Sequence, residues 1–276
     1  MSGDRKELLQ GMAHAAVAAG AAIMAIYDSD FAVETKSDSS PVTAADAAGE
    51  AVILEALARL APDIPVVAEE EAAAGRIPKT GGRFFLVDPL DGTKEFISRN
   101  GDFTVNIALI EDHAPSLGVV FAPVEARLFA GDVEAGRAWS ATVDPMGVIG
   151  APQSLHIRAA PTGGLAAVAS RSHNSPATEA YLDRFDIASR VSRGSSLKIC
   201  MVACGEADLY PRLAPTMEWD IAAGDAVLRA AGGTLSAPDG SPMTYGKPRF
   251  FNPGFVAAGD VETPPIAPFM GPAGSD

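Results

Sequence analysis

The residues best suited to chemistry stand together in Asp88-Pro89-Leu90-Asp91-Gly92-Thr93, directly after the apolar run Arg83 to Val87. Aromatic and β-branched residues in so short a run are typical of a buried strand, so we expect Asp88 at the strand's end. Pro89 lacks an amide hydrogen and has a fixed φ, and it should stop the strand and start a turn. Such a turn would bring Asp91 back beside Asp88 and leave the carbonyl of Leu90 available as a ligand.

The last two residues of this segment suit a phosphate group. Gly92 has no side chain to obstruct an anion that approaches the backbone, and Thr93 supplies a hydroxyl at the expected first turn of a helix. Carboxylate and carbonyl oxygens are donors that Mg²⁺ prefers, and the ion fills its other positions with water and substrate phosphate. The segment therefore predicts a metal-assisted phosphate site. A plain strand-turn-helix with solvated aspartates is the competing interpretation, because Asp-Pro and Asp-Gly are common turn signals.

Three further segments place a carboxylate or hydroxyl in a similar setting. Glu69 follows the apolar residues Val66-Val67-Ala68, at the end of an expected strand. Thr43 and Asp46 stand ahead of a helical pattern, where Thr43 would be an N-cap and Asp46 its capping-box partner. Asp220 follows Trp219 and is placed to cap the helix after it. Taken singly, each segment has a purely structural explanation.

Composition sets outer limits on function. The chain has 276 residues, of which 47% are hydrophobic, so it can bury a sizeable core as one large domain or two smaller ones. A net charge of -14 argues against binding to a nucleic acid polymer and also repels an anionic substrate. Divalent cations and local Lys or Arg residues would have to reverse that field at a phosphate site.

Cys200 and Cys204 are four residues apart, and we interpret them as small apolar residues on one helix face in a reducing cytoplasm.

Hydrophobic periodicity and breakers predict helices and strands in mixed order. Expected helices are 5–29, a second helix ended by Pro62, 176–185, 196–204 and 220–231, the last ended by Gly232 and Gly233. Expected strands are 64–69, 83–87, 104–110, 117–122, 127–130, 137–140 and 165–170. The stretch from Ala141 to Pro161, with three prolines, is the predicted linker. The Pro/Gly-rich residues 262–276 are expected to be a mobile tail.

The first expected helix lacks the marks of a targeting segment. Val17 to Tyr27 is uncharged and apolar, but residues of both charge signs precede it and no small-residue cleavage pattern follows. We expect an Ala-rich amphipathic helix rather than a signal peptide, and no transmembrane span.

Together, the order of Thr43/Asp46, Glu69, the Asp88 to Thr93 segment and Trp219-Asp220 resembles the inositol monophosphatase superfamily of metal-dependent, lithium-sensitive phosphatases. The resemblance covers nearly the whole chain. Within the superfamily, further segments resemble the 3'(2'),5'-bisphosphate nucleotidases of the bacterial CysQ type, whereas the inositol enzymes usually carry a different pair after Asp-Gly-Thr. These segments are Gly92-Thr93-Lys94-Glu95-Phe96, residues 100–110, Ser170-Arg171-Ser172-His173, Gly194-Ser195-Ser196-Leu197-Lys198 and Phe251-Asn252-Pro253-Gly254-Phe255.

The resemblance implies a layered α/β/α/β/α phosphatase fold, an α/β (α+β) class. Residues 1–145 would form an N-terminal α+β half, and residues 146–261 a C-terminal α/β half that faces it across the site. Two or three Mg²⁺ ions would be bound by Glu69, Asp88, the Leu90 carbonyl, Asp91 and Asp220. Asp46 and Thr93 would activate the attacking water: a threonine hydroxyl is no base unaided, but hydrogen-bonded to an aspartate it can pass a proton on.

For the substrate, the resemblance implies contacts from Gly92, Thr93, Ser170, His173, Gly194 and Lys198, with Lys198 and Arg171 offering charge to a second phosphate. Without the resemblance, we would interpret His173 as a loop histidine that hydrogen-bonds to its neighbours, and Lys198 as a solvated helix residue. The implied reaction is hydrolysis of adenosine 3',5'-bisphosphate, and of its 3'-phosphoadenosine 5'-phosphosulfate analogue, in sulfate assimilation. An inositol or sugar phosphatase and a non-catalytic metal-binding regulator are the alternatives. Common features of the superfamily add a homodimer and weak association with the cytoplasmic face of the inner membrane.

Overall fold

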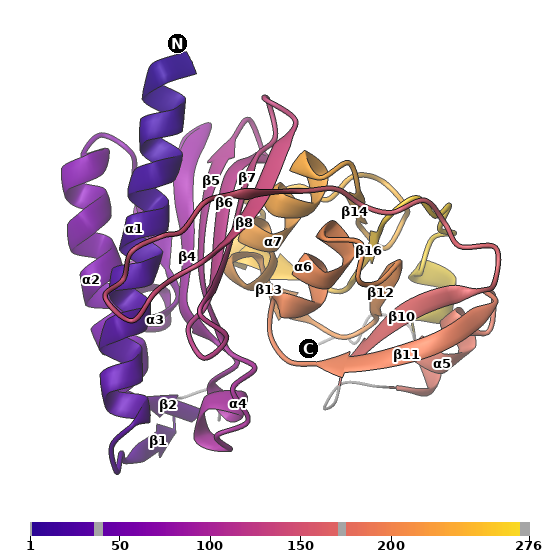
Figure 1. Cartoon of the computed structure of the whole chain (residues 1–276), viewed down its shortest axis with the longest axis horizontal. Coiled ribbons are helices and arrows are strands. Elements are labelled where there is room, and N and C mark those ends of the chain that lie inside the picture. Colours follow the sequence, from indigo (N-terminus) through magenta and orange to yellow (C-terminus); the bar gives the residue numbers. More distant parts are fainter. Residues whose placement is uncertain (1, 36–40, 171–174, 271–276) are drawn as a thin grey trace.

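A computed structural model describes residues 2–35, 41–170 and 175–270 of the chain. Its layers alternate between helices and sheets (Figure 1). The longer helices are α1 (Ser2–Tyr27), α2 (Ala44–Leu60), α5 (Pro176–Leu182), α6 (Leu197–Ala203) and α7 (Glu218–Ala230). Short helical turns are α3 (Glu69–Ala73), α4 (Thr93–Ile97), η1 (Pro248–Phe250) and η2 (Ala267–Phe269).

A sheet of seven strands forms the larger half of the molecule, in the order β3-β4-β5-β6-β7-β8-β9. Its strands are β3 (Val66–Ala68), β4 (Arg83–Asp91), β5 (Thr104–Glu111), β6 (Ala114–Ala122), β7 (Arg127–Asp132), β8 (Arg137–Thr142) and β9 (Gln153–Leu155). Only β3 and β4 run parallel, so both of their carboxyl ends lie at one edge of the sheet.

A second sheet has five strands in the order β11-β10-β12-β16-β14. These are β10 (Leu165–Ser170), β11 (Ile187–Arg193), β12 (Leu209–Arg212), β14 (Thr234–Ser236) and β16 (Phe255–Ala258). Two small pairs complete the strands: β1 (Val33–Thr35) with β2 (Pro41–Thr43), and β13 (Thr216–Met217) with β15 (Phe251–Asn252).

Both faces of the large sheet are buried, which explains its continuous apolar runs. Along β5, Val105, Ile107 and Leu109 pack with α1 and α2, while Ala108 and Ile110 pack with α6 and α7. This alternation is the two-residue period of a strand, and it turns Asn106 towards α6 and α7. By the same period, Asp88 of β4 shares the face of Phe84 and Leu86, and points towards α7. The layers α/β/α/β/α, with α5 and η2 outermost, confirm the expected fold class.

The strand expected to stop at Pro89 continues to Asp91. Asp88 pairs with Asn106 and Asp91 with Thr104, so β4 has one residue more than β5 between these pairs. This is a β-bulge, and a bulge tolerates a proline because the extra residue needs no ladder hydrogen bond. The prediction of a strand end was wrong, but its consequence holds: the bulge redirects the backbone between the two aspartates.

The stretch taken for a linker contains structure of its own. It holds the end of β8 and the edge strand β9, which pairs with Ala138 to Ser140. Pairing with β8 makes residues 153–155 a strand, since their sequence has little periodicity. The boundary between the halves at residue 145 stays a prediction.

The C-terminal residues 262–270 also pack, in contrast to the mobile tail expected from composition. Ile266 is fully buried in a cluster with Tyr181 and Leu182, and the Tyr181 hydroxyl donates a hydrogen bond to the carbonyl of Pro264 (2.8 Å). Burial of these apolar residues outweighs the loop-forming tendency of the prolines.

Helix α1 is long and apolar enough, by length and composition, to cross a membrane; it is the one such helix in the described residues. Residues 8–27 carry no Asp, Glu, Lys or Arg, and the expectation of no transmembrane span stays a prediction. Half of its most apolar window is buried inside the protein, against α2 and the sheet.

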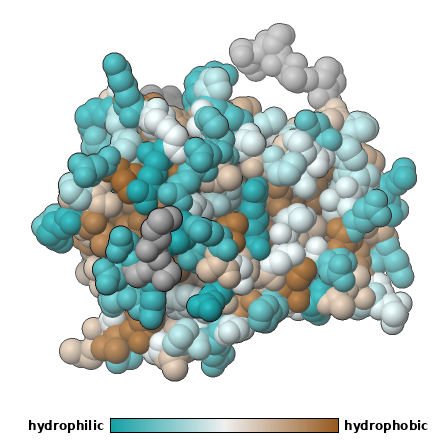
Figure 2. All heavy atoms as spheres, turned by 90° about the horizontal axis from the view of Figure 1, so that it is seen from above, coloured by the Kyte–Doolittle hydropathy of each residue, from teal (hydrophilic) through white to brown (hydrophobic). Residues whose placement is uncertain are grey.

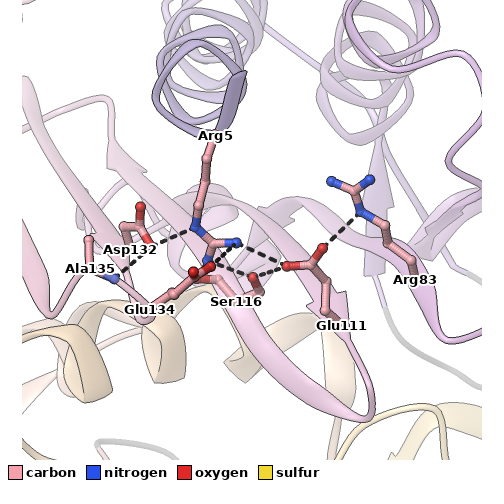
Figure 3. A network of polar contacts seen from close by, with 7 residues as sticks. All are labelled: Arg5, Arg83, Glu111, Ser116, Asp132, Glu134 and Ala135. Atoms are coloured by element: carbon pink, nitrogen blue, oxygen red, sulfur yellow. Dashed lines mark hydrogen bonds and ion pairs between the residues drawn. The ribbon is translucent and has the colours of Figure 1, made fainter. Parts of the chain in front are cut away.

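The start of α1 is tied to the sheet by Arg5, whose guanidinium donates to Asp132 (2.8 Å), Glu111 (3.0 Å) and the carbonyl of Ser116 (2.9 Å) (Figure 3). On the face drawn in Figure 2, small hydrophobic patches alternate with hydrophilic side chains.

Candidate active site

Thr93 and Asp46 form a hydrogen-bonded pair at the start of two helices. The Thr93 hydroxyl donates to Asp46 Oδ1 (3.1 Å), and it also lies 3.4 Å from the carbonyl of Leu90. The other oxygen, Asp46 Oδ2, accepts from the amide (2.8 Å) and hydroxyl (2.9 Å) of Thr43. The expected capping box is therefore present and holds one oxygen of Asp46, while the second oxygen meets Thr93. Asp46 is only 1% exposed, so its carboxylate is held in one orientation.

Three more predicted carboxylates gather around Asp88. Because β3 and β4 are parallel and in register, Glu69, which begins α3, emerges beside Asp88. Burial raises the pKa of Asp88 well above its usual range, and the charges of Glu69, Asp91 and Asp220 raise it further. The structure thus brings together all four side chains that the sequence assigned to one cluster. Buried like charges repel one another, and a divalent cation is the partner that relieves this repulsion.

Asp220 belongs to α7, whereas the other three carboxylates come from the end of β3 and from β4. It is the third residue of α7, whose N-cap is Met217, so the expectation that Asp220 itself is the N-cap was wrong. Its Oδ2 accepts from the amide of Met217 (3.0 Å) and from the hydroxyl of Thr216. Burial raises the pKa of Asp220, and these hydrogen bonds and the charges of Arg212 and Lys198 oppose that rise.

In the described part of the chain, no three Asp, Glu, His or Cys side chains already stand in the geometry of a closed metal cage. The carboxylates form a looser cluster, and their role as ligands stays a prediction. The chemistry of the donors still fits Mg²⁺, which needs few protein ligands and keeps several waters. Leu90 lies between Asp88 and Asp91 on the bulge, and its carbonyl stays a predicted ligand of the same set.

Gly92 follows the bulge with φ 96°, a left-handed conformation that favours glycine. A Cβ there would lie 3.2 Å from the carbonyl oxygen of Asp102. A Cβ on Gly194 would lie 2.7 Å from that same oxygen, so both glycines are required by the close approach of the backbone around Asp102. Their contacts with substrate stay predictions.

Lys198 is buried rather than solvated, with 4% of its surface exposed. Its Nζ lies 5.5 Å from the ring centre of Tyr210, and its charge lowers the pKa of Asp91 against the effects of burial and of Asp220. Ser170 ends β10, and its side chain is outside what the structure describes. Arg171 and His173 lie outside the described residues.

Arg212 was missed by sequence reasoning. It ends β12, donates to the carbonyls of Pro215 (2.8 Å) and Ala214 (3.4 Å), and its charge lowers the pKa of both Asp91 and Asp220. A lone arginine after an apolar strand has no distinctive sequence signal. With Lys198 it supplies the local positive charge that a phosphate needs in an acidic chain.

Comparison with known proteins assigns the chain to a family. A model of the inositol monophosphatase family matches residues 4–261. The 3'(2'),5'-bisphosphate nucleotidase CysQ of Salmonella typhimurium is 46% identical over 253 residues, covering 90% of this chain and 98% of the relative. The protein of the same name from Escherichia coli K12 is 46% identical over 241 residues, covering 86% and 94%.

Solved structures agree with the sequence relatives. The crystal structure of CysQ from Bacteroides thetaiotaomicron superposes with a TM-score of 0.72 at 37% identity, covering 92% of this chain and 98% of that one. The inositol monophosphatase from Anabaena has a TM-score of 0.71 at 26% identity, covering 91% and 90%. The chain belongs to the inositol monophosphatase family.

Proposed function

We propose that the protein is a Mg²⁺-dependent phosphatase that hydrolyses the 3'-phosphate of adenosine 3',5'-bisphosphate to give AMP and phosphate. The observation that carries the proposal is the Thr93–Asp46 pair, which lies beside the buried carboxylate of Asp88 and the half-buried carboxylates of Asp91 and Asp220. Relatives 46% identical are named for this activity. The 5'-phosphosulfate analogue, 3'-phosphoadenosine 5'-phosphosulfate, is a second expected substrate.

Glu69, Asp88, the Leu90 carbonyl, Asp91 and Asp220 would hold two or three Mg²⁺ ions. When bound, these ions supply positive charge to the phosphate oxygens and lower the pKa of a bound water. Enzymes of this family are generally Mg²⁺-dependent, which supports the choice of metal.

The chain's own contribution to water activation is the ordered pair of Thr93 and Asp46. Because the Thr93 hydroxyl donates its proton to Asp46 Oδ1, its oxygen is left to accept a proton from a water aimed at the phosphate. As it does so, the Thr93 hydroxyl passes its own proton to Asp46 Oδ1, and this carboxylate, held in place by Thr43, takes up the proton. Lys198 and Arg212 draw the anionic substrate to this point.

A substrate panel tests the activity. Phosphate release is measured from adenosine 3',5'-bisphosphate, its phosphosulfate analogue, inositol 1-phosphate and a sugar phosphate, each with a Mg²⁺ titration and with added lithium. We expect turnover of the two nucleotides, dependent on Mg²⁺ and inhibited by lithium. Efficient cleavage of inositol phosphate with little cleavage of the nucleotides would reassign the substrate, and no turnover at all would favour a non-catalytic regulator.

The metal cluster has its own test in Asp91→Asn. Loss of this carboxylate should lower turnover by about a hundredfold or more. Loss of a residue that only orients a metal ligand already costs about 10- to 100-fold in activity, and loss of the ligand itself should cost at least as much. Asp63→Asn, which changes an exposed aspartate, is the matched control. Turnover by Asp91→Asn within about threefold of the parent would contradict the two-metal mechanism.

Assembly and location stay predictions. A homodimer is checked by sedimentation of the purified chain. A cytoplasmic location with weak peripheral attachment to the inner membrane is checked by cell fractionation at low and high salt, because an electrostatic attachment weakens with salt.

A further inference from the structure

Ser196 links the start of α6 to strands β4 and β5 of the large sheet, next to Asp91. Its backbone amide donates to Asp91 Oδ2 (2.6 Å). Its hydroxyl donates to Asn106 Oδ1 (2.8 Å) and lies 2.8 Å from the hydroxyl of Thr104. Ser196 comes from the segment before α6, whereas Asp91, Asn106 and Thr104 belong to β4 and β5. The residue therefore bonds across the interface between the layers, with both its backbone and its side chain.

The position of Ser196 in its own helix makes these bonds unusual. It is the N-cap of α6, where a serine hydroxyl normally accepts from an amide in the first turn. Here the hydroxyl makes no such cap bond, and the residue has φ -67° and ψ -9° rather than the extended cap conformation. The hydroxyl contacts Asn106 and Thr104 of β5 instead. Helix capping therefore does not explain why a serine stands at this position.

The partners of Ser196 are almost entirely removed from water. Thr104 and Asn106 are 0% exposed and Ser196 is 3% exposed. A hydrogen bond lost at such a depth leaves a polar group unsatisfied, and Asn106 Nδ2 already has no partner in the structure. The register also favours the arrangement, because Thr104 is paired with Asp91 across β4 and β5.

Two more bonds fix the same segment. The amide of Gly194 donates to Asp102 Oδ2 (2.9 Å), and Arg193 forms an ion pair with Asp102 Oδ1 (3.0 Å). On the other side of Ser196, Lys198 lies two residues further along α6. The Ser196 hydroxyl thus adds an anchor on β5 at the start of the helix that carries Lys198, at the point where the Ser196 amide contacts Asp91.

We propose that Ser196 is a positioning residue that holds Asp91 and Lys198 in one arrangement and so couples the metal site to the substrate-binding helix α6. The proposal rests on the function proposed above, in which Asp91 binds metal and Lys198 binds substrate. Without the Ser196 hydroxyl, α6 loses its anchor on β5, and the amide no longer fixes the orientation of the Asp91 carboxylate.

Calorimetric titration of the protein with Mg²⁺ alone tests this coupling without turnover. Ser196→Ala should weaken Mg²⁺ binding by about 10- to 100-fold, the range found when a residue that orients a metal ligand is lost. Ser192→Ala, an exposed serine in the preceding strand, is the matched control and should bind Mg²⁺ within about twofold of the parent. Unchanged Mg²⁺ affinity in Ser196→Ala, with lower thermal stability alone, would overturn the proposal.

Thr104 supplies a second set of variants that does not touch the segment before α6. Thr104→Val removes one partner of Ser196 and should weaken Mg²⁺ binding in the same direction but less, whereas Thr104→Ser retains the hydroxyl and should restore it. In Ser196→Ala combined with Thr104→Val, the effects should be less than additive in free energy, because the two residues share one interaction. Full additivity, or equal affinity in the Val and Ser variants, would contradict the coupling.

Kinetics on adenosine 3',5'-bisphosphate completes the test. Ser196→Ala should raise both the KM for the nucleotide and the Mg²⁺ concentration for half-maximal activity, since Lys198 and Asp91 are displaced together. If the parent does not cleave the nucleotide but Ser196→Ala still weakens Mg²⁺ binding, only the proposed function fails. If the parent cleaves it and Ser196→Ala binds Mg²⁺ like the parent, only the coupling fails.

Discussion

At the scale of single residues, the carboxylates of this site serve structure and chemistry through different oxygens. Asp46 Oδ2 closes a capping box with Thr43, and Asp46 Oδ1 receives the hydroxyl of Thr93. Asp220 Oδ2 binds the start of α7 in a similar way. A cap fixes the carboxylate rotamer, and a fixed rotamer is what catalysis requires. The structural and the catalytic interpretations of Asp46 therefore do not compete.

A pair of substitutions at Thr93 tests this conclusion. Thr93→Ala removes the hydroxyl and should lower kcat by about 10² to 10⁴, the usual contribution of a positioned proton acceptor. Thr93→Ser keeps the hydroxyl and should stay within about tenfold of the parent. Steady-state kinetics at saturating Mg²⁺ gives both values, and equal rates for the two variants would remove Thr93 from the mechanism.

At the scale of elements, α2 supports two parts of the site from one face. Asp46 and Glu50 stand one helical turn apart. The Glu50 carboxylate accepts from the amides of Glu70 (2.8 Å) and Glu71 (3.1 Å), in the first turn of α3. Since α3 begins with Glu69, the same helix positions the water-activating pair and the end of β3.

Glu50 also makes stability depend on pH. Burial raises its pKa from 4.5 to about 7, so the folded chain holds the proton more tightly than the unfolded chain does. The stabilisation is complete below pH 4.5 and is lost as the pH rises through about 7. Over that window, urea unfolding should show the parent losing on the order of 3 kcal/mol relative to Glu50→Gln.

The exposed Glu55 on the same helix provides the control for this measurement, with 71% of its side chain exposed. Glu55→Gln should follow the parent at every pH. Parallel pH curves for the parent and Glu50→Gln would show that the buried carboxylate does not titrate in this range.

At the scale of the whole molecule, three hydrophobic clusters hold five layers together. One lies between α1 and α2 and the large sheet, a second between the sheets around α6 and α7, and a third on the outer face of the small sheet. The third cluster includes Ile266 and, at its edge, Phe269. The C-terminal segment is thus part of the layer that covers the small sheet.

Ile266→Ala should therefore cost about 2–5 kcal/mol of unfolding free energy, as other large-to-small substitutions in a core do. Met146→Ala, at a side chain 86% exposed, should stay within about 0.5 kcal/mol of the parent. Denaturant unfolding monitored by circular dichroism compares the two. Equal stability would mean that residues 262–270 do not belong to the core.

Local patterns in the sequence were sufficient for the long helices and for β4 to β8. The helical spacing of apolar residues before Pro62 predicts α2, and the Thr43–Asp46 capping box follows from residues three apart. The carboxylates could be grouped only because their order along the chain resembles that of the family, since each segment taken singly has a structural explanation. Residue type and short spacing carry the information for the helices and strands.

What the sequence could not decide depends on contacts between distant residues. The bulge at Pro89 requires β5 as a partner, and β9 requires β8, so neither is visible in a single segment. The burial of Lys198, the approach of Arg212 and the bond from Ser196 to Asp91 arise only where the two sheets meet around α6 and α7. Local chemistry thus determined the residues of the site, and tertiary packing alone determined what surrounds and orients them, because hydrogen bonding and burial depend on which surfaces meet.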